Sequence, residues 1–146
     1  MSTYAARAYS ATHEDRLSDA DPLELIRMLY RAAVDAIAKA RLALASGDIG
    51  QRSAAITRAS EILAELTSAL DMDQGGELAR RLFDLYDYIQ RRLQEANFLQ
   101  ADEPLAESHG LLSTLLEGWE QCRPQASGPV PVRAAGSRAA TAAVTA

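Results

Sequence analysis

Four segments of the sequence carry apolar residues at helical spacing, and short runs of turn-forming residues separate them. In the second segment, Ile56, Ala59 and Leu63 are three and four residues apart, which places them on one face of a helix. No segment combines two-residue alternation with the β-branched enrichment of a strand. Long helices with short connections pack as antiparallel neighbours. The pattern therefore predicts an all-α fold, an antiparallel up-down-up-down four-helix bundle.

Turn and capping residues set the expected ends of the helices. Asp21 is a candidate N-cap, Pro22 suits the first helical position, and Glu24 stands where a capping box places its acid. Gly47 suits a left-handed residue after the first helix, and Asp48 suits the N-cap of the second. The expected helices run from about 22 to 45, 48 to 70, 77 to 99, and from a cap at 102–104 to just before 124.

Apolar spacing also predicts which residues form the core. The third helix places a row of large residues on one face, and the fourth helix carries a similar row that ends on an aromatic residue. The expected core residues of these two helices are Leu78, Leu82, Leu85, Tyr86, Ile89, Leu93, Ala96, Leu105, Leu112, Leu115, Leu116, Trp119 and Cys122.

The two ends of the chain differ from the bundle. Residues 124–146 mix Pro, Gly, Ser, Thr and Ala with few large apolar residues, so they bury too little surface to offset the entropy lost on ordering. Residues 1–20 lack a helical repeat, but they contain Tyr4 and Tyr9, a pair that could cover an apolar groove. We expect a mobile N-terminal arm (1–20), a bundle (21–123) and a disordered tail (124–146).

Composition excludes several classes of function. One Cys and two His rule out a disulfide framework and a multi-His metal centre, so neither a metal nor a cofactor is expected. A net charge of −5 argues against a nucleic-acid ligand. Neither a membrane span nor a secretory signal is evident, which indicates a cytoplasmic protein. The carboxylates form no paired apolar site, so an enzyme is not expected.

The first two helices carry more apolar surface than one core seam needs. Beside the seam of the first helix, a second strip contains Leu25, Met28, Ala32 and Ala36. The second helix has a similar flanking strip, formed by Ala55, Ile62 and Ala69. Spare strips of this kind suggest a groove for another polypeptide. Alternatively, the small Ala residues simply widen the buried face of a tightly packed bundle, and the spacing leaves both interpretations open.

Five stretches occur in a consistent order along residues 4–122. Residues 22–30 read Pro-Leu-Glu-Leu-Ile-Arg-Met-Leu-Tyr, and residues 45–48 read Ala-Ser-Gly-Asp. The end of the second helix has Leu66 and Leu70-Asp71. Residues 82–97 read Leu-Phe-Asp-Leu-Tyr-Asp-Tyr-Ile-Gln-Arg-Arg-Leu-Gln-Glu-Ala-Asn, and residues 111–119 run from Leu-Leu to Trp. Together they resemble the FliS family of flagellar secretion chaperones, including its Leu-Tyr-x-Tyr-Ile signature.

The resemblance implies a cytoplasmic antiparallel bundle that binds the disordered C-terminal segment of newly made flagellin. Such a chaperone prevents premature polymerisation and helps deliver flagellin to the flagellar type III export apparatus. The resemblance also implies that an arm bearing Tyr4 and Tyr9 covers part of the binding surface when the chaperone is empty. Binding by a monomer, 1:1 with its client, is expected. One departure is Arg31-Ala32, where the family commonly has Asp-Gly.

The apolar strips and the resemblance together predict the residues that contact the client. The expected flagellin-binding residues are Tyr4, Tyr9, Leu25, Met28, Ala55, Ala59, Ile62, Phe83 and Tyr86. One alternative is a homo-oligomeric structural bundle whose spare strips pack against a second copy. Another is histidine phosphotransfer through His109, which the position of the only lysine, Lys39, on a different helix disfavours.

Overall fold

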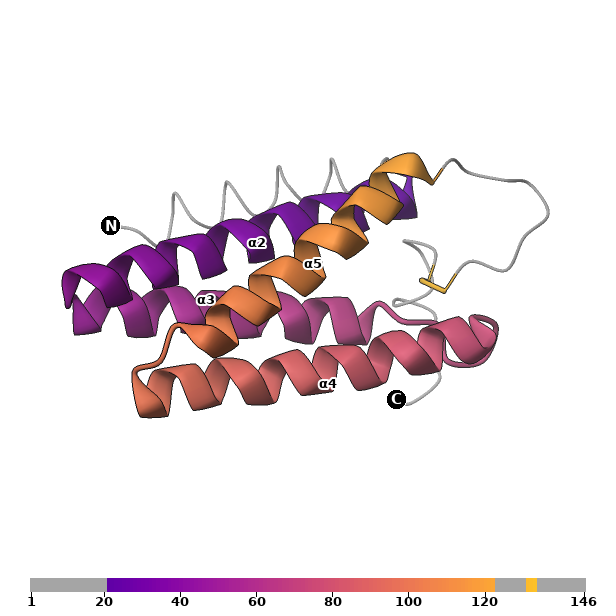
Figure 1. Ribbon diagram of the computed structural model, residues 1–146. Coiled ribbons are helices and arrows are strands. Elements are labelled where there is room, and N and C mark those ends of the chain that lie inside the picture. Colours follow the sequence, from indigo (N-terminus) through magenta and orange to yellow (C-terminus); the bar gives the residue numbers. More distant parts are fainter. Residues whose placement is uncertain (1–20, 123–130, 134–146) are drawn as a thin grey trace, which may run out of the picture.

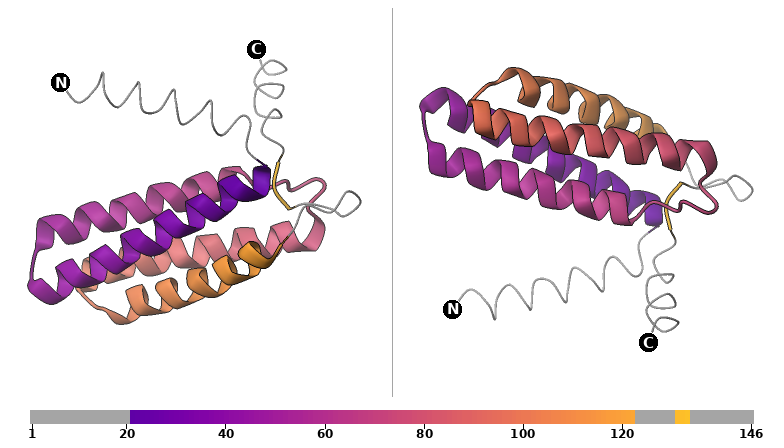
Figure 2. Two further views of the ribbon diagram at one scale, coloured as in Figure 1. Left: turned by 90° about the horizontal axis from the view of Figure 1, so that it is seen from above. Right: turned by 90° about the horizontal axis from the view of Figure 1, so that it is seen from below.

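The structure is a computed structural model that describes residues 21–122 and 131–133. It contains the helices α2 (Pro22–Ser46), α3 (Ile49–Ser68), α4 (Gly76–Leu99) and α5 (Glu103–Gln121). Successive helices run in opposite directions, and α5 returns to pack on α2 (Figure 1). The two views in Figure 2 show the α2–α3 pair beside the α4–α5 pair. The predicted antiparallel four-helix bundle is thus confirmed.

Capping residues begin α2 and α3, and end α2, as the sequence predicts. The Asp21 carboxylate accepts a hydrogen bond of 3.1 Å from the backbone N–H of Leu23, at the start of α2. Gly47 follows α2 with a φ of 73°, a left-handed conformation that favours glycine. The Asp48 carboxylate then caps α3 by accepting from the N–H of Gln51 at 3.1 Å.

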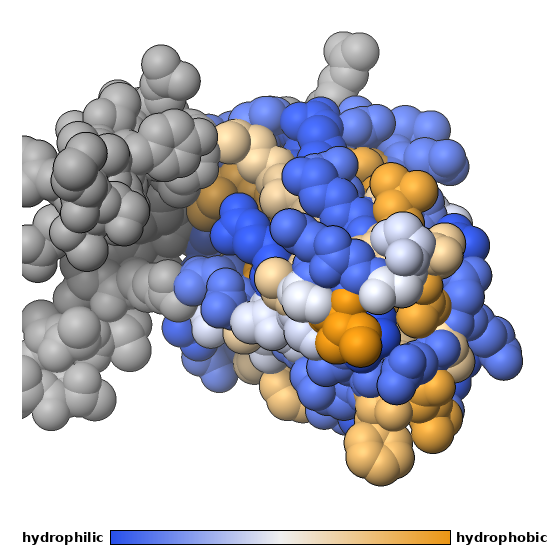
Figure 3. Space-filling view, turned by 90° about the vertical axis from the view of Figure 1, so that its left-hand side faces the viewer, coloured by the Kyte–Doolittle hydropathy of each residue, from blue (hydrophilic) through white to orange (hydrophobic). Residues whose placement is uncertain are grey.

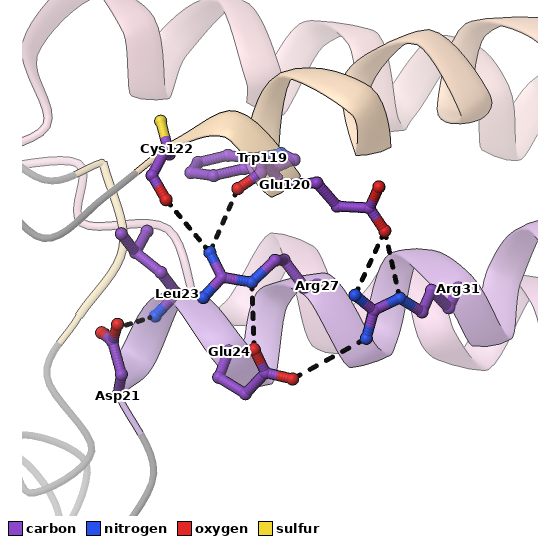
Figure 4. A network of polar contacts seen from close by, with 8 residues as sticks. All are labelled: Asp21, Leu23, Glu24, Arg27, Arg31, Trp119, Glu120 and Cys122. Atoms are coloured by element: carbon purple, nitrogen blue, oxygen red, sulfur yellow. Dashed lines mark hydrogen bonds and ion pairs between the residues drawn. The ribbon is translucent and has the colours of Figure 1, made fainter.

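The start of α2 is tied to the end of α5 by a polar network (Figure 4). Glu24, the predicted capping-box acid, forms an ion pair with Arg27 at 3.0 Å. The guanidinium of Arg27 donates to the carbonyl oxygens of Trp119 and Cys122 at 3.1 and 3.3 Å. Carbonyls at the end of a helix lack intrahelical partners, and a cation there is also favoured by the helix dipole. Arg27 therefore caps α5 from a neighbouring helix.

Two tyrosines and a tryptophan pack together in the core. Tyr30 of α2 and Tyr86 of α4 are 0% and 1% exposed, and their hydroxyl oxygens are 2.6 Å apart in a hydrogen bond. The indole of Trp119 packs on Tyr30 with ring centroids 6.1 Å apart. Each hydroxyl thus has a partner, which a buried polar group needs.

Two of the predicted core residues, both near helix ends, are exposed instead. Leu78 was expected in the core, but it is 52% exposed, and Ala79 is buried instead. Ala79 packs closely on Gly75 at the start of α4, since a Cβ added to Gly75 would lie only 2.7 Å from the Cβ of Ala79. Cys122 is exposed and follows the end of α5.

The predicted cap of α5 has a different partner. Asp102 has a helical backbone conformation and makes no side-chain capping bond. Its carboxylate instead accepts two hydrogen bonds from Arg41 of α2, at 2.8 and 3.0 Å. The bidentate pair lowers the pKa of the Asp102 carboxyl, and it connects the end of α2 to the α4–α5 turn.

Three residues of the predicted tail are described by the structure. Pro131 and Val132 are buried, and Val132 pairs with Leu70 in an isolated antiparallel β-bridge at one end of the bundle (Figures 1 and 2). The structure differs from the predicted disorder at residues 131–133, because Val132 reaches the apolar core. The division into arm, bundle and tail otherwise stays a prediction.

Candidate functional site

The second apolar strip of α2 is divided between the core and the surface. Ala36 is 5% exposed and belongs to the core. Ala32, one turn earlier, is half-buried and packs against the core. Leu25 and Met28 are also half-buried, so part of each side chain is open to solvent. Packing within the bundle therefore accounts for Ala36, whereas a groove for another polypeptide at Leu25 and Met28 stays a prediction.

The facing strip of α3 is divided in the same way. Ala59 and Ile62 are 0% and 4% exposed and lie in the core, although both were predicted to bind a client. Ala55 and Ala69 are half-buried. Small side chains such as Ala36 and Ala59 let α2 and α3 pack closely, with much of the strip used for this contact.

A shallow groove of about 560 Å³ lies between α2 and α3, near the turn that joins them. Its lining residues are Lys39, Leu42, Ala43, Ser46, Asp48, Gln51 and Ala55. Fifteen residues separate Met28 from Ala43 on α2, which corresponds to about 22 Å along the helix axis. The half-exposed apolar residues are thus spread along the bundle rather than gathered in one pocket. Such a shape suits an elongated ligand.

Tyr86, another predicted contact residue, is part of the core. Its hydroxyl bonds Tyr30, and burial raises the pKa of both phenols above the usual value, so both stay neutral. Tyr88, two residues further on, is 38% exposed, and its hydroxyl donates to Glu107 of α5. The first tyrosine of the Leu-Tyr-x-Tyr motif therefore holds α2 and α4 together, and the second faces solvent as predicted.

Phe83 is 44% exposed, but it lies apart from the α2 strip. It precedes Gln90 by seven residues, so the two share a side of α4. Gln90 accepts from the hydroxyl of Ser60 on α3 at 2.5 Å, which shows that this side faces α3. Phe83 therefore borders the α3–α4 contact, and α3 separates it from α2. Tyr4 and Tyr9 lie outside the described residues.

The last residue of the matching stretch 82–97 also has a structural role. Asn97 near the end of α4 accepts hydrogen bonds, each of 3.3 Å, from Arg52 and Ser53 near the start of α3. Arg52 is only 6% exposed, so this partner satisfies a largely buried cation. Sequence reasoning did not assign this contact, although the position of Asn97 in the motif was a signal for it.

A second apolar surface lies at the end of the bundle that contains the α2–α3 and α4–α5 turns. Figure 3 views this end and shows hydrophobic side chains with hydrophilic ones between them. Four large apolar residues near these turns are exposed: Leu42, Ile49, Phe98 and Leu99. Sequence reasoning missed this surface, although large apolar residues flanking two turns could have indicated it.

The described residues provide apolar surface rather than a reactive centre. Within 21–122 and 131–133, no group of His, Cys, Asp or Glu is placed to hold a metal ion. None of the helices in this part of the chain is long and apolar enough to cross a membrane. His109 of α5 is half-buried. What these residues offer is the half-exposed strip of α2 and the groove between α2 and α3.

Comparisons with known proteins identify the family of this chain. The family model described as flagellar protein FliS matches residues 5–126. The flagellar secretion chaperone FliS of Salmonella typhimurium is 40% identical over 115 residues, which cover 78% of this chain and 85% of the relative. FliSB of Pseudomonas aeruginosa is 37% identical over 107 residues, or 73% and 85% of the two chains. These relatives are named chaperones and not enzymes. The chain therefore belongs to the FliS family of flagellar secretion chaperones.

Proposed function

We propose that this chain binds the disordered C-terminal segment of flagellin in the cytoplasm, prevents premature polymerisation and helps deliver flagellin to the flagellar type III export apparatus. One observation supports this most directly. A half-exposed apolar strip with Leu25 and Met28 runs along α2 toward the groove at Ala55. An amphipathic client helix that lies along such a strip can bury its apolar face on it.

The proposed contact residues are those whose side chains reach the surface. They are Leu25, Met28 and Ala55 on the α2–α3 face, with Phe83 as a separate contact on α4. Ala59, Ile62 and Tyr86 support this surface from inside the bundle. Tyr4 and Tyr9 are proposed to cover the strip in the empty chaperone and to move away when the client arrives.

Binding of a disordered client would be coupled to its folding. The client loses conformational entropy when it docks, so the net affinity is much smaller than the buried area suggests. Burial of apolar surface also gives a negative heat-capacity change. A modest affinity suits a chaperone that must release its cargo to an export apparatus.

Calorimetry with two forms of flagellin tests the proposal. We expect full-length flagellin to bind 1:1 with a negative heat-capacity change, and flagellin without its C-terminal segment to give no binding heat. Equal binding of both forms, or binding of neither, would overturn the proposal.

Leu25→Glu tests the strip itself, with Leu78→Glu as the matched control. Both variants replace a leucine by the same charged residue, but Leu78 lies on α4 and is 52% exposed. We expect Leu25→Glu to weaken flagellin binding by about tenfold or more, because a charge would have to be desolvated in the interface. Leu78→Glu should change the affinity by less than about twofold. Equal effects would show that the client does not use the α2 strip.

The second candidate is a homo-oligomeric structural bundle, and the exposed apolar end with Leu42, Ile49, Phe98 and Leu99 favours it. The mass in solution separates the two functions. A monomer that becomes a 1:1 complex on addition of flagellin supports the chaperone, whereas a stable oligomer that ignores flagellin supports the structural role.

A further inference from the structure

Residues 131–133 contact the α3–α4 connection through an isolated antiparallel β-bridge. The N–H of Asp71 donates to the carbonyl of Pro131 at 2.9 Å, and the N–H of Arg133 donates to the carbonyl of Ala69 at 2.9 Å. Val132 stands opposite Leu70 in the antiparallel bridge between these two bonds. The connection therefore offers a donor and an acceptor in the arrangement that one added strand needs.

The side chains and backbone at this contact fit closely. The two opposed residues form a non-hydrogen-bonded pair, in which side chains approach most closely. Leu70 and Val132 are 2% and 6% exposed, and both belong to the hydrophobic core. A Cβ on Gly75 would lie 3.0 Å from the Cα of Pro131, so the glycine lets the strand come near. Proline is acceptable at position 131, because only its carbonyl is used.

The strand lies outside the region shared with the family, since the family match ends at residue 126. We propose that the α3–α4 connection is a docking site for an extended peptide with a β-branched apolar residue, and that residues 131–133 fill this site as a detachable strap. The strap is held by two backbone hydrogen bonds and by the buried residues Pro131 and Val132, against the entropy cost of ordering it. A small net gain makes the contact reversible.

The tether to α5 gives the strap an advantage over free peptides. Eight residues link Cys122 to Pro131, and a short linker keeps the local concentration of the strand in the millimolar range. A peptide from another molecule must therefore displace the strap before it can bind. This inference rests on the contacts of residues 131–133 and does not depend on flagellin binding.

Val132→Asp in the full chain detaches the strap, and Val144→Asp is the matched control in the same tail. We expect Val132→Asp to lower the folding equilibrium constant about fivefold, which lowers Tm by about 4–8 °C in a domain of this size. Hydrogen exchange at the Asp71 amide should become at least about tenfold faster, because its acceptor is lost. Val144→Asp should change neither quantity.

Binding in trans then tests the vacated site. A fluorescent peptide with the sequence of residues 128–136 should bind the Val132→Asp chain, raise its Tm and restore protection of the Asp71 amide. We expect it to bind the wild-type chain about tenfold or more weakly, because the strap competes. The same peptide with Asp at the position of Val132 should not bind.

Two outcomes would overturn the proposal. One is the same Tm and the same Asp71 exchange rate in Val132→Asp and Val144→Asp. The other is equal binding of the two peptides, or equal binding to both chains. If Val132→Asp unfolds the bundle, Val132→Ala supplies the same readouts with a milder change, and unchanged exchange at Asp71 in that variant also refutes the strap.

Discussion

The hydrogen bond between Tyr30 and Tyr86 supports a quantitative prediction about the core. Each tyrosine is almost fully buried, and the 2.6 Å contact joins α2 to α4. In Tyr86→Phe, the ring stays but the hydroxyl of Tyr30 loses this partner. A buried hydroxyl without a partner costs about 1–3 kcal/mol, so the free energy of unfolding should fall by about that amount. Tyr30→Phe should have a similar effect for the same reason.

The double variant distinguishes a lost partner from lost packing. When both hydroxyls are absent, no polar group is left without a partner, and the cost should approach that of a single variant rather than the sum of the two. We therefore expect a coupling energy of about 1–2 kcal/mol between the two positions. Urea denaturation followed by far-ultraviolet circular dichroism measures all three variants against the wild-type chain.

Tyr88→Phe is the matched control, because it makes the same change on the same helix at a residue that is 38% exposed. It should alter the free energy of unfolding by less than about 0.5 kcal/mol. Additive effects of Tyr30→Phe and Tyr86→Phe, or an effect of Tyr86→Phe no larger than that of Tyr88→Phe, would refute the reasoning. Flagellin affinity of folded Tyr86→Phe should remain unchanged, since the side chain does not reach the surface.

Three further predictions concern the core, an ion pair and a turn. Ile62→Glu should abolish the helical circular dichroism signal, because it buries a charge at a site that is 4% exposed; retained helicity would place Ile62 on the surface. Arg41 lowers the pKa of Asp102, so this carboxylate stabilises the fold above its unfolded pKa of about 4, and this stability is lost as the pH falls through the lower folded value. Asp102→Asn should therefore show a smaller loss of stability below about pH 4 in acid titrations monitored by circular dichroism, and an unchanged acid response would contradict the pairing. Gly75→Ala should lower the free energy of unfolding by more than about 1 kcal/mol, because its Cβ would lie 2.4 Å from a backbone oxygen, whereas Gly110→Ala, with open space at its Cβ, should raise it by up to about 1 kcal/mol in urea denaturation.

The ends of the helices were predictable because their signals are local. Asp21 and Asp48 cap the chain within three residues of their own positions, and Gly47 adopts its left-handed conformation without help from distant residues. Asp102 shows the limit of this reasoning. Its carboxylate pairs with Arg41, which lies 61 residues away in sequence, and makes no capping hydrogen bond.

The candidate site was only partly predictable because helical periodicity does not say what covers an apolar strip. Met28 and Ile62 both flank a core seam, and the spacing alone treats them alike. In the structure, Ile62 is buried in the core, while Met28 stays half-exposed. Contact across a long sequence separation also explains why Val132 was missed, since nothing near it in the sequence indicates its pairing with Leu70.

The hydrogen bonds from Arg27 to the end of α5 can form only late in the synthesis of the chain. Their acceptors, the carbonyls of Trp119 and Cys122, are made more than 50 residues after the last residue of α3. At about 5–20 residues per second, translation from Ser68 to Cys122 takes roughly 3–11 s. During that interval the α2–α3 hairpin emerges from the ribosome without its closing partner. The nascent hairpin therefore exposes its core-facing side until α4 and α5 have been made and can pack on it, and α5 completes the bundle only when synthesis is nearly finished.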